Sequence, residues 1–222
     1  MESKMKFWKK FAFGLGDFGG NFCFSFISSF ALIYFTDIAG ANVLGNDNMY
    51  GVLSIAMMIP MFISLLVTPS LTKKFGMQKT GMGAGTLFVI GSLVGLIGGS
   101  SLPVLLTGIV IRSLGMGPIS AIIVTLAASV SDNIILKKKV NIEGMTFSCS
   151  SIGIKIGSGV GTALVGWLLA FVGYIGKEAT DSVLTMIRIS YLFVPVILGI
   201  LLIVCFLFMN VEEENKKLRE TI

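Results

Sequence analysis

Long apolar segments separated by short polar connections make up most of this chain. They cover about residues 11 to 38, 48 to 69, 80 to 99, 103 to 129, 144 to 173 and 184 to 209. A helix needs about 20 predominantly apolar residues to cross the hydrocarbon core of a bilayer, and each segment reaches about that length. The pattern predicts an all-α membrane protein with six transmembrane helices.

The composition supports a membrane protein and excludes several functional classes. The 222 residues are 54% hydrophobic and 13% charged, a balance unsuited to a soluble domain. The chain has no histidine, so the commonest proton shuttle and metal ligand are missing. No nucleophile and base pair or metal-ligand set replaces it, and we expect no enzyme activity, cofactor or metal site. The three cysteines lie apart in apolar segments, which favours free thiols over disulfides.

The positive charges are distributed unevenly among the connections. Four lysines precede the first segment, three lie in the connection 70–79, three lie in the connection 130–143, and three cations follow residue 210. The remaining three connections hold only Lys177. By the positive-inside rule, this asymmetry predicts a multi-pass protein of the cell membrane with both termini in the cytoplasm. The net charge of +5 therefore indicates contact with the lipid bilayer rather than with nucleic acid.

A polar stripe crosses the fifth segment, with members three or four residues apart: Ser148, Ser151, Lys155, Ser158 and Thr162. This spacing places them on one face of a helix. Lys155 is the only charged residue between Gly144 and Tyr174, near the middle of the span. An ammonium at that depth costs on the order of 2.5 to 3.5 kcal/mol on insertion scales, so it should face protein or a wet cavity.

A second stripe on the first segment contains Asp17, Asn21, Ser25 and Ser28 at similar spacing. Together the two stripes offer hydroxyl, amide, carboxylate and ammonium groups, which suit a solute with many hydroxyls, such as a sugar. A structural interpretation stays open, because serine and threonine in membrane helices often bond their own backbone and a lone lysine can pair with a carboxylate.

Two further charges lie inside or near spans and have alternative interpretations. Asp17 is a candidate counter-ion for Lys155, a candidate proton or sodium site, or a residue of the helix start. Arg112 lies about nine residues into the fourth segment, where it pairs with an acid or fixes a helix.

Several stretches resemble the glycoside-pentoside-hexuronide cation symporters, relatives of melibiose permease in the major facilitator superfamily. The run FGLGDFGGNF, Phe13 to Phe22, is similar to the family's first helix. The second half is similar through Asp132, Glu143-Gly144, Ser148, Lys155, Gly157, Gly166-Trp167 and Gly173-Tyr174. By this resemblance, residues 1–42 correspond to helix 1, residues 43–210 to helices 8 to 12, and residues 211–222 to a cytoplasmic tail.

The resemblance implies a partial major-facilitator bundle, with a helix 11 lysine, Lys155, lining the sugar and cation cavity. It aligns Asn21 with a helix 1 aspartate that contacts sugar, and Asp17 with a variant seen in other relatives. Asn21, Asp17 and two members of the polar stripe on the fifth segment, Ser151 and Thr162, are further solute-binding candidates. Asp132 matches a loop aspartate of the family's gating charges, and Arg112 is the other candidate for a charge pair. Ser129 and Ile135 replace two acids of that loop, which weakens the family's pattern.

The resemblance passes from helix 1 to helix 8 near residues 38 to 46, so six helices have no counterpart. The skipped part carries the helix 2 aspartates that bind the coupling cation, sodium or proton. The implied function is cation-coupled symport of a sugar or glycoside by alternating access, in a form that needs a homodimer or a second transporter half. The alternative is a non-transporting remnant or a membrane interaction subunit.

Overall fold

The structure, a computed structural model, describes residues 19, 21–22, 24–30, 33, 49–98, 101–139, 143–174, 180–209 and 211–221. Throughout these residues the regular structure is helical, which confirms the predicted all-α class. After helical residues between 19 and 33, the elements are α2 (Met49–Phe75), α3 (Met77–Gly98), α4 (Leu102–Lys138), α5 (Glu143–Phe171), α6 (Asp181–Arg188), the π-helix η2 (Ile189–Phe193), α7 (Val194–Leu207) and α8 (Val211–Thr221).

Five of the described helices are long and apolar enough to cross a membrane. They are α2, α3, α4, α5 and the helix that begins at Asp181 and continues through η2 into α7. These five agree with the last five predicted spans. The first predicted span, residues 11–38, lies mostly outside the described residues.

The connections predicted at 70–79 and 130–143 are mostly helical, so these two predictions were wrong. α2 continues to Phe75 and α3 begins at Met77, with a single turn residue, Gly76, at φ +83° between them. α4 continues to Lys138. Hydropathy marks where lipid ends, whereas a helix can continue into water because leucine and lysine are good helix formers. At about 1.5 Å per residue, the 37 residues of α4 span about 55 Å, well beyond a core about 30 Å thick.

α3 and α4 pack backbone to backbone through glycines. A Cβ added to Gly91 of α3 would collide with the backbone nitrogen of Arg112, and one added to Gly108 of α4 would lie 2.7 Å from the nitrogen of Gly95. Helices approach this closely only where side chains are small, which lets dispersion act where lipid supplies no hydrophobic drive. These four positions hold the middle of the two helices together.

Two further glycines of α3 lie at close contacts with α7. A Cβ on Gly81 would lie 2.7 Å from the Phe206 ring of α7, and one on Gly85 would lie 2.7 Å from Ile203. At these two glycines α3 packs closely against side chains of α7.

The last span changes its helical pitch just before Pro195. η2 occupies Ile189–Phe193, and α7 follows with Pro195 near its start. Proline has no N–H and its ring clashes with the carbonyl four residues earlier, so the preceding turn cannot keep regular α-helical bonds. A π-helical turn absorbs that conflict and places Ser190, Tyr191 and Leu192 inside the bundle.

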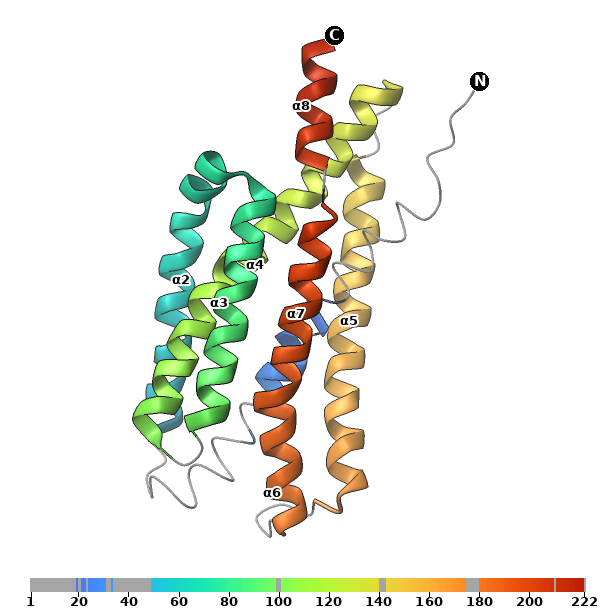
Figure 1. Cartoon of the computed structure of the whole chain (residues 1–222). Coiled ribbons are helices and arrows are strands. Elements are labelled where there is room, and N and C mark those ends of the chain that lie inside the picture. The colour runs from blue at the N-terminus through green and yellow to red at the C-terminus, as the bar shows by residue number, and fades with distance from the viewer. Residues whose placement is uncertain are drawn as a thin grey trace.

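The helices form an elongated bundle (Figure 1). α2 and α3 lie on one side, α5 and α7 lie on the other, and α4 crosses obliquely from the first pair toward α5. α8 extends beyond the membrane-spanning part at the end where α4 finishes. We refer to this as the α8 end of the bundle, and it is the end predicted to be cytoplasmic.

Candidate functional site

The polar stripe predicted on the fifth span lies on α5 and faces outward. α5 is helical throughout, so the three- and four-residue spacing does form one continuous face. Ser148, Ser151, Lys155 and Thr162 are exposed, and Ser158 is half-buried. We call these five residues the α5 polar face.

Lys155 occupies the middle of this face. It comes 12 residues after Glu143, where α5 begins, which corresponds to about 18 Å along the helix. Its side chain is exposed, and within the described residues its ammonium has no hydrogen bond or ion pair. Because lipid penalises a bare ammonium at this depth, we expect water, a solute or a further protein segment to lie against the α5 polar face.

Three hydroxyls of the α5 polar face donate to carbonyls of their own helix. Ser148 Oγ donates to the Gly144 carbonyl at 2.7 Å, Ser158 Oγ to Lys155 at 3.4 Å, and Thr162 Oγ1 to Ser158 at 3.0 Å. This is the structural interpretation left open above for serine and threonine. Their oxygens still have lone pairs, so toward a ligand these groups act as acceptors.

Donors toward a ligand therefore come from two other residues of the face. The Lys155 ammonium offers three N–H groups, and the Ser151 hydroxyl makes no hydrogen bond within the described part of the chain. A sugar hydroxyl both donates and accepts, so it can pair with Lys155 and with the neighbouring serine and threonine oxygens at once. The face is chemically matched to hydroxyl groups.

The first helix crosses α5 beside this face. A Cβ added to Gly161 would lie 2.8 Å from the carbonyl oxygen of Phe22 and 3.4 Å from the nitrogen of Phe26. Asn21, next to Phe22, is half-buried and has a polar or ring contact. The crossing therefore brings the segment of Asn21 against the turn of α5 that carries Thr162. Asp17 lies outside the described residues.

Arg112 lies elsewhere, inside the bundle between α4 and η2. Its side chain is 3% exposed, and Nη2 donates to the Tyr191 hydroxyl at 2.6 Å. The guanidinium carbon also lies 4.7 Å from the centre of the Tyr191 ring, a cation–π distance. The structure thus pairs Arg112 with the buried phenol of Tyr191. Arg112 is not part of the α5 polar face that carries Lys155.

Asp132 lies near the α8 end, where its carboxylate accepts from Arg219 Nη2 of α8 at 3.0 Å. The pair is largely exposed, so its attraction is screened by water. The structure supplies Asp132 with a charge partner within the same bundle, and a gating role for it stays a prediction.

Sequence reasoning missed the partners of these charges. One feature of the sequence could have indicated Tyr191 as a partner: it is a polar aromatic residue four positions before a proline inside an apolar span. Arg219 was counted only for its charge. Its partner is 87 positions away in the chain, a separation at which helical periodicity gives no information.

Comparison with known proteins identifies the family. A family model described as MFS/sugar transport protein, where MFS is the major facilitator superfamily, matches residues 22–213. The chain belongs to this family. The family resemblance inferred from the sequence is thereby confirmed.

Two curated members of this transporter family show how much of a full-length protein is present. The isoprimeverose transporter of Lactiplantibacillus pentosus is 30% identical over 160 residues, which are 70% of this chain and 33% of that protein. The glucuronide carrier protein homolog of Escherichia coli (strain K12) is 27% identical over 206 residues, 88% of this chain and 43% of that protein. The chain spans less than half the length of these relatives.

Proposed function

We propose that this chain forms one bundle of a sugar or glycoside transporter that works by cation-coupled symport and alternating access. The observation that carries the proposal is the exposed Lys155 in the middle of a membrane-spanning helix, flanked by hydroxyl acceptors. Membership of a sugar transport family and relatives named for isoprimeverose and glucuronide transport support a sugar or glycoside as solute.

In this mechanism, the α5 polar face forms one wall of a midplane cavity. Lys155 and Ser151 donate to solute hydroxyls, while Ser158 and Thr162 accept. Asn21 and Asp17 extend the wall along the first helix. Asp17 is also the candidate for the coupling sodium ion or proton.

Among the described residues nothing covers the α5 polar face, which leaves room for an opposite wall from a second bundle. We propose that a second copy of this chain or a partner transporter half supplies it. Alternating access is then the rocking of one bundle against the other about the shared site. The lysine distribution supports an orientation with both termini of each bundle in the cytoplasm.

Uptake of radiolabelled glycosides into membrane vesicles tests the proposal. Replacing Lys155 by Met keeps the side-chain length and removes the charge. Loss of a hydrogen bond from a charged donor, worth about 1.5 to 3 kcal/mol, should lower solute affinity or uptake about 10- to 100-fold. Ile156→Met, at the adjacent exposed position, is the matched control and should retain uptake. Equal uptake by Lys155→Met and the original chain would show that Lys155 does not bind the solute.

The second candidate is a membrane protein that has kept the family's packing without transport. The hydroxyls of Ser148, Ser158 and Thr162 favour it, because each already satisfies its donor within α5. Absence of uptake for every glycoside tested, from protein shown to be folded and inserted, would select this function over the first.

A further inference from the structure

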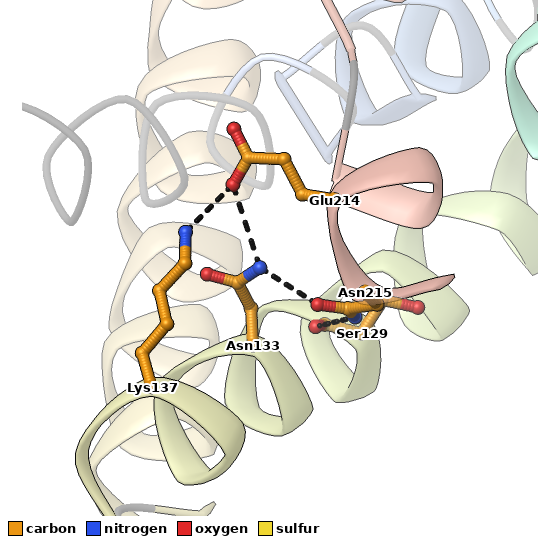
Figure 2. A network of polar contacts seen from close by, with 5 residues as sticks. All are labelled: Ser129, Asn133, Lys137, Glu214 and Asn215. Carbon is orange, nitrogen blue, oxygen red and sulfur yellow. Dashed lines mark hydrogen bonds and ion pairs between the residues drawn. The ribbon is translucent and has the colours of Figure 1, made fainter. Parts of the chain in front are cut away.

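The C-terminal helix α8 is joined to α4 through a buried pair of amides. Asn133 Nδ2 donates to Asn215 Oδ1 at 2.7 Å, and Asn215 Nδ2 donates to the Ser129 carbonyl at 2.8 Å (Figure 2). Both asparagines are 8% exposed. Each of these bonds satisfies a buried group that water cannot reach, so the amides fix how α8 lies on α4.

Two ion pairs flank the amides on the same helices. Lys137 Nζ lies 2.8 Å from Glu214 Oε2 (Figure 2). Arg219 Nη2 lies 3.0 Å from Asp132 Oδ2. Exposed pairs of this kind are individually weak and are screened by salt. The two ion pairs help to orient α8 on α4, and they are weak enough for the contact to open.

The first turn of α8 also reaches α3. Glu212 Oε2 accepts a hydrogen bond from the backbone nitrogen of Met77 at 2.7 Å. Met77 begins α3, so its N–H has no partner within that helix, and a carboxylate there is favoured by the helix dipole. Glu212 therefore acts as an N-terminal cap supplied by a residue 135 positions away.

α8 contacts two helix ends at once through polar groups. Its one side chain described as buried is Asn215, whereas Glu213 and Lys216 are exposed on other sides. Detaching such a helix exchanges protein hydrogen bonds for bonds to water and exposes little apolar surface. A contact of this composition can open and close while the apolar bundle stays packed.

We propose that α8 is a clasp that couples the start of α3 to the end of α4, so that both helix ends loosen together when α8 undocks. Asn133 and Asn215 position α8, and Glu212 transmits its docking to α3. The clasp is a conformational device at the α8 end of the bundle. It stands on these contacts alone and does not require that the protein transports.

Hydrogen exchange of the full chain in lipid nanodiscs, read by mass spectrometry, tests the clasp. Asn215→Leu removes both amide bonds of Asn215 at similar side-chain size. It should accelerate exchange about tenfold in residues 129–137 and also in residues 77–82, which Asn215 does not touch. Lys216→Leu, the exposed neighbour, is the matched control and should leave both segments unchanged.

A reciprocal pair of variants covers the case in which Asn215→Leu does not fold. Glu212→Ala changes an exposed side chain, and coupling between two sites must act in both directions. It should accelerate exchange in residues 129–137, while the adjacent Glu213→Ala should not. Acceleration confined to the segment that each variant touches would show two independent local contacts and overturn the clasp, as would no acceleration in either segment.

Discussion

Among the described residues, the buried cation Arg112 contacts a neutral group. Arg112 and Tyr191 are 3% and 0% exposed, and the phenol supplies both an acceptor oxygen and a π face. The arrangement avoids burying a second charge, whose desolvation would offset much of the attraction. It also ties η2 to α4 at one defined point.

Tyr191→Phe should reveal the strength of this contact. The variant keeps the ring and removes the hydroxyl, which leaves the Nη2 donor of Arg112 without its buried acceptor, at a cost of about 1 to 3 kcal/mol in free energy of unfolding. Thermal unfolding of the detergent-solubilised protein measures the change. Thr185→Val removes an exposed hydroxyl that bonds only its own helix, at Asp181, and should shift stability by less than about 0.5 kcal/mol. Equal melting temperatures for the two variants would show that the hydrogen bond from Arg112 to Tyr191 adds no more stability than the exposed Thr185 hydroxyl.

At the scale of helices, close approach is concentrated where α3 meets α4. The backbone contacts at Gly91 and Gly108 leave no space for a methyl group. Because the colliding atoms belong to the backbone, no side-chain rotation can relieve the collision. We expect this pair of helices to move as one body.

Gly91→Ala should therefore destabilise the bundle, by about 1 to 3 kcal/mol, as overpacking forces the two helices apart. Gly83→Ala is the matched control on the same helix, because an added Cβ there meets nothing within 4 Å. Alanine is the better helix former, so this control should be neutral or stabilising by up to about 1 kcal/mol. Thermal unfolding of both variants checks the contrast, and equal effects would contradict the proposed tightness.

Helices and their apolar spans were predictable because hydropathy and length carry that information locally. The ends of the helices were not predictable. α4 continues nine residues beyond the predicted end at 129, through a stretch that contains polar and charged residues and is still helical. The α5 polar face followed from spacing alone. The hydrogen bonds of its hydroxyls could not be predicted in this way. Whether a hydroxyl donates to the backbone or to a ligand depends on its rotamer, which the sequence does not determine. The pair of Asn133 and Asn215, 82 positions apart, depends on how the bundle folds.

At the scale of the whole molecule, the unmatched feature is the exposed α5 polar face. A protein in lipid keeps such a face against water or against other protein segments. Family membership supplies the geometry in which two bundles enclose such a cavity. The partner and the orientation of the bundle can be tested in one experiment.

An amine-reactive crosslinker that cannot cross membranes should act from one side only. Twelve of the 14 lysines lie in the four regions predicted to be cytoplasmic, so inverted vesicles should be labelled strongly and right-side-out vesicles weakly. In inverted vesicles the product should include a dimer or a complex with a second transporter half. Strong labelling from outside would reverse the predicted orientation, and a monomer alone would contradict the second bundle.

The length of α4 has a mechanical consequence. A helix of about 55 Å in a hydrocarbon core of about 30 Å leaves a long arm in water, and α8 is attached to that arm. If the helix pivots as a rod near its outer end, a change in tilt of about 10° moves the tip sideways by about 10 Å. α4 is thus a lever arm whose small rotations within the bilayer become displacements that a fluorophore or spin label placed on the tip could measure.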